Sequence, residues 1–310
     1  MENQTTVTEF ILLGLSSDPQ MQIFLFLVFS VIYLNTLVGN IVIMVVIRTD
    51  SHLHTPMYFF LFHLSIVDIG YSSVTVPNML INFLAEQKTI LFNNCIAQMF
   101  LFFLLAGTEV FILSAMAYDR YLAICDPLHY VKIMSTAMCV QLVSGAWMIG
   151  FFYAQLNTVL VLRLHFCGHN QISHFSCDLP ALLQLSCTET LTSQVVRLTC
   201  AVTIGVCTFL VTLISYIHII STILRIRSAE GRRKAFSTCS SHLIVVGLFY
   251  LTAFFHYTKP SSVSSVLLDE MFSIQYSILT PMLNPIIYSL KNKEMKTALR
   301  KIFRKFKFLK

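Results

Sequence analysis

The chain is organised around ten residues, Met116-Ala117-Tyr118-Asp119-Arg120-Tyr121-Leu122-Ala123-Ile124-Cys125, which close a long apolar run that starts at Cys95. An acid and a base therefore stand side by side at the end of a segment long enough to cross a membrane. A charge in mid-bilayer costs roughly 2.5–3.5 kcal/mol on insertion scales, and less near the interface. We interpret Asp119 and Arg120 as a pair that is held at the membrane boundary and can be released. The alternative is a simple stop signal at the membrane edge.

The composition excludes an ordinary soluble domain. Of 310 residues, 56% are hydrophobic and 12% are charged, whereas soluble proteins carry about 25% charged residues. The first 22 residues contain no basic start followed by an apolar core, so we expect no cleaved signal peptide and a first span that serves as the anchor.

Seven apolar segments are long enough to span a bilayer. They predict an all-α membrane protein, a seven-transmembrane helix bundle whose two ends lie on opposite sides. The expected divisions are an extracellular N-terminal segment (1–22), the transmembrane domain (23–290) and a cytoplasmic basic tail (291–310). The predicted spans are about 23–47, 57–84, 95–124, 138–162, 195–224, 236–257 and 267–290.

The basic residues predict the orientation. With the N-terminus outside, the first two inner loops and their helix ends hold three Lys or Arg, the third holds five and the tail holds nine. Only Lys88, Arg163, Arg197 and Lys259 remain outside. This bias places the N-terminus outside and the C-terminus in the cytosol, at the plasma membrane. It also explains the net charge of +6 without a nucleic-acid partner.

Each end of the chain carries a further signal. Asn3-Gln4-Thr5 is a glycosylation sequon, which suits an outer N-terminus. The tail predicts a short basic amphipathic helix lying on an anionic inner leaflet, with a disordered basic tail as the alternative. Its apolar positions at helical spacing are Met295, Leu299, Ile302, Phe303 and Phe306.

Four cysteines fall on the predicted outer side, where disulfides persist. Cys95, Cys167, Cys177 and Cys187 allow three pairings, and their spacing does not choose among them. Zinc binding is the alternative, because the same loop holds several histidines. The spacing lacks a C-x-x-C or H-x-x-x-H pair, so we expect disulfides and no metal there.

Two carboxyls lie near the middle of their spans. Asp68 and Glu109, if both ionised, would cost roughly 5–7 kcal/mol together. We expect them to share a proton or a cation; the alternative is a pair of protonated carboxyls that hold helices together. Glu109 and Arg120 are eleven residues apart, so they share a face of the third helix.

The seventh span ends in a segment that we expect to deform. Pro281 and Pro285 each remove a backbone hydrogen bond and kink a helix, and they flank Asn284. Tyr288 follows one turn later. The prediction is a kinked, deformable segment near the cytosolic side.

Taken with these features, several motifs resemble the odorant (olfactory) receptors, class II type, of the rhodopsin-like G-protein-coupled receptor superfamily. The triplet Asp119-Arg120-Tyr121 indicates only the superfamily, whereas the stretches at 53–61 and 234–243 are specific to odorant receptors. The stretches are GN at 39–40, LHTPMYFFL at 53–61, LSIVD at 64–68, SY at 215–216, KAFSTCSSHL at 234–243 and PMLNPIIYSLKN at 281–292.

The resemblance implies bridges Cys95–Cys177 and Cys167–Cys187, and a sodium-type site at Asp68, Glu109 and Asn284. It also implies that Arg120 is released on activation and meets a stimulatory, olfactory-type G protein that raises cyclic AMP. The residues expected in coupling and activation are Asp119, Arg120, Tyr121, Tyr216, Asn284, Pro285 and Tyr288.

The ligand carried over from the resemblance is a small volatile odorant. Most of the implied ligand-facing side chains are aromatic or aliphatic, so we expect a mostly apolar ligand with at most one or two polar groups. The ligand-facing positions are Phe102, Phe103, Ala106, Gly107, Ile204, Tyr250, Phe254, Tyr257, Ile274 and Ser277.

Three positions depart from the family pattern, namely Leu122, Leu251 and Asp126. Leu251 is expected to affect the sixth helix or the pocket, and Asp126 to affect coupling. A receptor for a non-odorant small molecule outside the nose is one alternative. A transporter or channel is another, but no internal repeat supports it. No nucleophile triad or phosphate-binding glycine loop indicates an enzyme.

Overall fold

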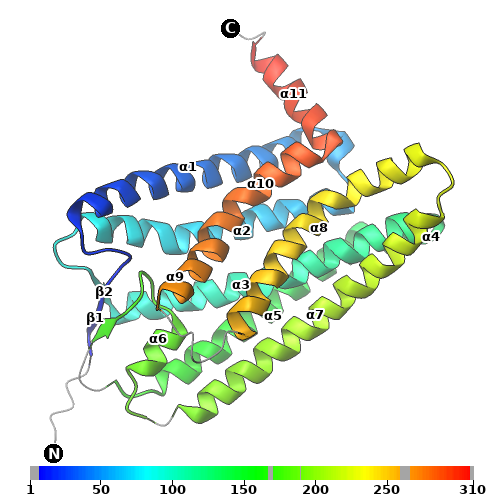
Figure 1. Cartoon of the computed structure of the whole chain (residues 1–310). Coiled ribbons are helices and arrows are strands. Elements are labelled where there is room, and N and C mark those ends of the chain that lie inside the picture. Colours follow the sequence, from blue (N-terminus) through cyan, green and yellow to red (C-terminus); the bar gives the residue numbers. More distant parts are fainter. Residues whose placement is uncertain (1–6, 167–169, 189, 259–265, 308–310) are drawn as a thin grey trace, which may run out of the picture.

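The computed structural model describes residues 7–166, 170–188, 190–258 and 266–307. It is a bundle of long, roughly aligned helices with a small sheet at one end (Figure 1). The helices are α1 (Pro19–Thr49), η1 (Ser51–Leu53), α2 (Pro56–Leu84), α3 (Phe92–Cys125), α4 (Pro127–Ile133), α5 (Thr136–Leu162), α6 (Leu179–Gln184), α7 (Leu191–Arg225), α8 (Ala229–Thr258), α9 (Val266–Ile274), η3 (Gln275–Leu279), α10 (Thr280–Lys291) and α11 (Lys293–Lys307).

Within the described residues, five helices are long and apolar enough to cross a membrane: α1, α2, α3, α5 and α7. Their outer faces are apolar as well. On α1, the side chains of Leu27, Leu34 and Val38 are 58–59% exposed. A helix that is hydrophobic on both its packed and its exposed face is a membrane span, because lipid replaces water around it.

The sixth and seventh predicted spans are helical but broken. α8 bends by 45° between Ala229–Ser237 and Cys239–Phe254. The seventh span is not one regular helix, because a π-helical turn, η3, separates α9 from α10. The turn ends beside Pro281, which has no N–H to continue the regular ladder. The break therefore lies earlier in the span than the two prolines alone predict.

α3 is the central helix of the bundle and packs against α2, α5, α7 and α8. It approaches α5 closely at Gly107 and Gly150, where an added Cβ on Gly107 would lie 2.9 Å from the Gly150 Cα. Small residues at a crossing point let two membrane helices approach closely. The large cluster of buried apolar side chains around α3 includes Leu64, Leu113 and Met116.

One end of the bundle, here called the sheet end, carries β1 (Glu9–Leu12), β2 (Thr89–Leu91) and β3 (Gln171–Ile172). β1 is central, antiparallel to β2 and parallel to β3. The predicted Cys95–Cys177 disulfide is present and ties α3 to the loop beneath the sheet. Phe10 and Leu12 are buried against this loop, so part of the polar N-terminal segment is a structural strand.

The other end, here called the Arg120 end, carries α4 and α11. The expected amphipathic tail helix is α11, with Met295 buried against the bundle. Tyr58 fixes its start, since its hydroxyl donates to Glu294 (2.8 Å) and Asn292 (3.0 Å). The side chains of Ile302, Phe303 and Phe306 lie outside the described set, as do Asn3 and Cys167 of the predicted sequon and second disulfide.

Candidate functional site

A cavity of about 150 Å³ lies within the bundle below α6, near the sheet end. Phe102, Phe103 and Ala106 line it from α3, because positions i and i+4 of a helix share a face. The Phe102 ring packs edge-on against Tyr71 of α2 (5.5 Å) and against Tyr276 of η3 (5.3 Å). The cavity is thus walled by aromatic rings from at least three elements.

A smaller space of about 40 Å³ shares Phe102, Phe103 and Tyr276 with this cavity and extends it toward the disulfide. Its roof is positioned by Gln98, whose side chain accepts the Cys177 N–H (2.9 Å) and donates to the Val74 carbonyl (2.9 Å). The disulfide and this hydrogen bond together hold the loop over the cavity.

Two charged side chains line the main cavity, Asp178 from the loop and Arg197 from α7. The Arg197 Nε is buried and has no hydrogen-bond partner among the described residues, and no ion pair of Arg197 is found there either. A buried polar group without a partner is destabilising unless a ligand or water supplies one. Sequence reasoning treated Arg197 only as an orientation signal. The signal for more was a base inside an apolar span, which by default marks a functional site.

Four of the ten expected ligand-facing residues line these spaces: Phe102, Phe103, Ala106 and Ser277. The aromatic residues Tyr71, Phe249, Phe272 and Tyr276 line them too and were missed. They come from α2, α8 and the last span, and the sequence does not reveal how each of these helices is rotated about its own axis.

The other expected ligand-facing residues lie elsewhere. Gly107 faces Gly150 of α5, and Ile274 packs in the cluster around Phe29. Phe254 is 60% exposed on the outside of α8. Ile204 and Tyr250 line neither space; the Tyr250 ring packs against Phe209 (5.2 Å). The Tyr257 side chain lies outside the described set.

Deeper in the bundle, Asp68 and Glu109 are both buried, at 1% and 2% exposure. Asn284 donates its amide to both Asp68 oxygens, at 3.0 and 3.1 Å. Their helices, α2 and α3, pack against each other. The Asn284 Oδ1 and the Ser65 Oγ are buried without a hydrogen-bond partner in the described part of the chain. Carboxylate, amide and hydroxyl oxygens are the donors that hard cations prefer, so these residues fit a small cation.

At the Arg120 end, Arg120 pairs with Asp119 at 2.7 Å, and the Asp119 side chain is fully buried. Tyr130 of α4 donates its hydroxyl to the other Asp119 oxygen at 2.7 Å. We call Asp119, Arg120 and Tyr130 the Asp119 cluster. Burial, followed by the nearby Asp119 carboxylate, raises the pKa of Tyr130, so its hydroxyl is a neutral donor. This geometry is a held pair; a bare stop signal would leave the carboxylate in solvent.

A chain of hydrogen bonds links α7, α8 and α3 one layer further in. The Tyr216 hydroxyl bonds to His242 Nδ1 at 2.7 Å, and His242 Nε2 bonds to the Leu113 carbonyl at 3.1 Å. His242 belongs to the stretch at 234–243 but was given no role from sequence. The His242 side chain is fully buried, so the network joins three helices without water access.

The remaining activation candidates surround this network. Tyr288 is 1% exposed, and its hydroxyl has no hydrogen-bond partner within the described ranges. Pro285 packs on α1, where a Cβ added to Gly39 would lie 3.0 Å from its ring. Tyr121 stacks with Tyr118 and packs against His218 of α7. Pro285 thus brings α10 into contact with α1, and Tyr121 brings α3 into contact with α7.

A family model described as olfactory receptor matches residues 29–306. The chain belongs to the olfactory receptor family. It is 48% identical to olfactory receptor 5G9 of Mus musculus over 310 residues, covering 100% of this chain and 99% of the mouse protein. It is 51% identical to olfactory receptor 5A1 of Homo sapiens over 305 residues, covering 98% and 97% of the two chains. It is 50% identical to olfactory receptor 5B12 of Homo sapiens over 307 residues, covering 99% and 98%.

Membership identifies the protein as an odorant receptor, a multi-pass membrane protein of the G-protein-coupled class and not an enzyme. The family implies a seven-helix bundle. α9, η3 and α10 together form the seventh helix of the olfactory receptor.

Proposed function

We propose that this olfactory receptor binds a small volatile ligand that is mostly apolar and carries one hydrogen-bond acceptor. The observation that carries this proposal is the aromatic cavity with the buried, unpartnered Arg197 Nε. Rings of Phe102, Tyr276 and Phe249 supply apolar contact, and Arg197 supplies a donor for a carbonyl or ester oxygen. Asp178 lines the same cavity and disfavours a ligand that would place negative charge next to it.

The receptor is proposed to sit in the plasma membrane with the N-terminus outside and α11 in the cytosol. The excess of Lys and Arg at the Arg120 end supports this orientation. With this orientation the main cavity, here called the odorant cavity, lies in the outer half of the bundle, and the Asp119 cluster lies in the inner half. Residues 1–22, 23–290 and 291–310 are then the outer segment, the transmembrane domain and the cytosolic tail, with Asn3 available for glycosylation.

Coupling is proposed to a stimulatory, olfactory-type G protein that raises cyclic AMP. Ligand entry among Phe102, Tyr276 and their neighbours would shift the contacts of α3 with η3, and α3 also carries Glu109 and Arg120. Release of Arg120 from Asp119 would then expose a guanidinium to the G protein. Tyr121, Tyr216, Asn284, Pro285 and Tyr288 are proposed to accommodate the movement.

A sodium ion is proposed as the resident ion between Asp68, Glu109 and Asn284. The buried oxygens described above support this choice, and two adjacent carboxyls without a cation would have to share a proton. The ion would stabilise the arrangement of α2, α3 and α10 that precedes activation.

The experiment that tests the proposed function is a cyclic AMP assay in cells that express an N-terminally tagged receptor, with surface labelling, against a panel of volatile compounds. We expect dose-dependent responses to compounds with one oxygen acceptor on an apolar skeleton. Responses confined to strongly polar or cationic compounds would contradict the ligand class. A response that required a different co-expressed G protein would contradict the coupling alone, because the ligand would still be identified.

A further inference from the structure

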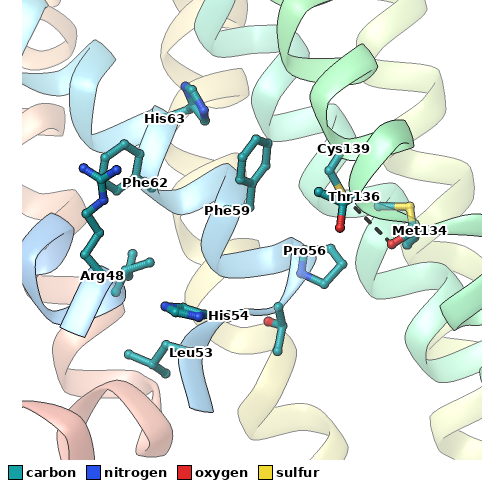
Figure 2. A pocket seen from close by; sticks show the side chains of 12 residues that line it. Arg48, Leu53, His54, Pro56, Phe59, Phe62, His63, Met134, Thr136 and Cys139 are labelled. Atoms are coloured by element: carbon teal, nitrogen blue, oxygen red, sulfur yellow. Dashed lines mark hydrogen bonds between the residues drawn. The ribbon is translucent and has the colours of Figure 1, made fainter. Parts of the chain in front are cut away.

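A second cavity, of about 420 Å³, lies at the Arg120 end, away from the odorant cavity. Its walls are the end of α1, η1, the first turns of α2 and the start of α5. Figure 2 shows Arg48, Leu53 and His54 along one side, Met134, Thr136 and Cys139 along the other, and Phe59 between them. Its volume falls in the range of sites that hold small molecules, roughly 300–1,000 Å³.

One end of this cavity is positively charged. The Arg48 guanidinium lies 6.0 Å from the centre of the Phe62 ring and has no acidic partner among the described residues. None of the residues that line the cavity is acidic. The nearest acid in sequence, Asp50, is engaged elsewhere, since it accepts the His52 N–H (3.1 Å) and pairs with Lys301 (3.5 Å).

One helix N-terminus adds to this positive end. α2 begins at Pro56, and the side chain of its N-cap residue, Thr55, makes no capping hydrogen bond. This helix start lines the cavity, and unsatisfied N–H groups at a helix start favour an anion. α5 also begins at the cavity, at Thr136, but the Ser135 side chain caps it by accepting the Met138 N–H at 3.4 Å.

A third, independent feature is a polar atom without a partner. The Nδ1 of His63 is buried and makes no hydrogen bond to any described residue. The His63 ring is held against Phe59 at 4.9 Å, which limits its rotation. His63 lines the cavity, so its ring adds a polar edge to this wall.

Most of the rest of the wall is apolar, the exceptions being His54 and two threonines. Leu53 and Met134 are buried, and Phe59 and Phe62 also line the space. A cationic end joined to an apolar groove fits an amphiphile with an anionic head. Basic pockets between membrane helices on the cytosolic side are a recognised arrangement for anionic lipid headgroups.

We propose that this cavity binds a phospholipid with a net anionic headgroup. The phosphate lies at Arg48 and the first turn of α2, and an acyl chain follows Phe59 and Met134. The orientation proposed for the receptor decides only which leaflet of the membrane supplies the lipid. The binding itself does not depend on odorant recognition, so a failure of either proposal leaves the other standing.

The test is native mass spectrometry of the full-length receptor purified in detergent and titrated with phosphatidylserine or phosphatidylcholine of the same chain length. Arg48→Gln removes the proposed phosphate partner. The matched control is Arg225→Gln, an exposed arginine at the end of α7, a helix that lines none of this cavity. Size-exclusion profiles establish that both variants fold.

We expect Arg48→Gln to weaken phosphatidylserine binding by roughly fivefold, the change typical of one basic residue at a membrane surface, and the control to match the wild type. A second variant, Thr136→Trp, fills the mouth of the groove and should reduce binding while keeping Arg48. Equal binding of both lipids, or equal loss in Arg48→Gln and Arg225→Gln, would overturn the proposal. Displacement of phosphatidylserine by an equal concentration of inorganic phosphate would overturn the role of the apolar groove.

Discussion

The Tyr130 hydroxyl and the Asp119 carboxylate are joined by a 2.7 Å hydrogen bond that ties α4 to α3. Asp119 uses its other oxygen for Arg120, so one buried carboxylate holds two partners at once. The arginine is therefore restrained by the loop helix as well as by its own neighbour.

Removing the Tyr130 hydroxyl should loosen this restraint. A hydrogen bond to a charged group contributes about 1.5–3 kcal/mol, part of which water restores at the membrane edge. We expect Tyr130→Phe to raise basal cyclic AMP by roughly three- to tenfold at equal surface expression. Tyr33→Phe, which removes an exposed hydroxyl bonded to Ser73, is the control. Unchanged basal activity in Tyr130→Phe would show that the bond does not restrain Arg120.

Removing the arginine itself should have the opposite effect. Arg120→Ala deletes the group proposed to meet the G protein, so ligand-evoked cyclic AMP should fall to background. Surface labelling should remain measurable, because Asp119 keeps its bond to Tyr130. Full signalling from this variant would remove the role assigned to Arg120.

The cavity predicts how ligand chemistry depends on Arg197. Arg197→Gln should weaken the potency of an acceptor-bearing ligand by roughly tenfold or more, since charge-assisted hydrogen bonds are the strong ones. An isosteric hydrocarbon analogue should lose little potency. Arg163→Gln, an exposed arginine at the end of α5, serves as the control. Equal losses for both ligands would mean that Arg197 has a structural role only.

The proposed sodium site makes a prediction for basal activity. Glu109→Gln keeps the shape of the side chain but removes its charge, so a bound cation loses one of its two anionic partners. The suppression of basal activity by sodium should therefore weaken, with potassium at the same ionic strength as the control. The same sodium dependence in wild type and variant would argue against the site.

A buried histidine under the sheet predicts a pH dependence of stability. Burial lowers the pKa of His174 below its usual value of about 6.5, although Asp178, a hydrogen bond to the Ser176 backbone and Asp269 act in the opposite direction. Its Nδ1 lies 3.1 Å from the Ser176 N–H and 3.2 Å from the Ser176 carbonyl, and its Nε2 faces Ser273 at 3.2 Å. Burial is the largest of these effects, so the folded receptor favours the neutral ring.

Below about pH 6.5 the unfolded chain binds a proton that the folded chain resists, so stability falls as the pH drops and is complete above that value. The Tm of the purified receptor should decrease from pH 7 to pH 5. His174→Gln should flatten this dependence, whereas His129→Gln, at an exposed site, should not. A parallel decrease in all three proteins would assign the effect to other groups.

Local properties of the chain were sufficient for much of the architecture. The length and apolarity of each segment predicted the spans, because crossing a bilayer depends on consecutive residues. The adjacency of Asp119 and Arg120 likewise made the ion pair predictable. The Cys95–Cys177 bridge followed from family resemblance; spacing alone left three pairings open.

Only the tertiary structure decided which side chains meet. Arg197, Tyr276 and Phe102 come from three different helices, and their convergence depends on the rotation of each helix about its axis. A membrane helix that is apolar on every face does not indicate which face turns toward the core, because lipid and core accept the same side chains. Gly107 was expected at the ligand from the family resemblance, yet it faces Gly150. The partners of Tyr130 and His242 lie 11 and 26 residues away along the chain, so these contacts became visible only in the fold.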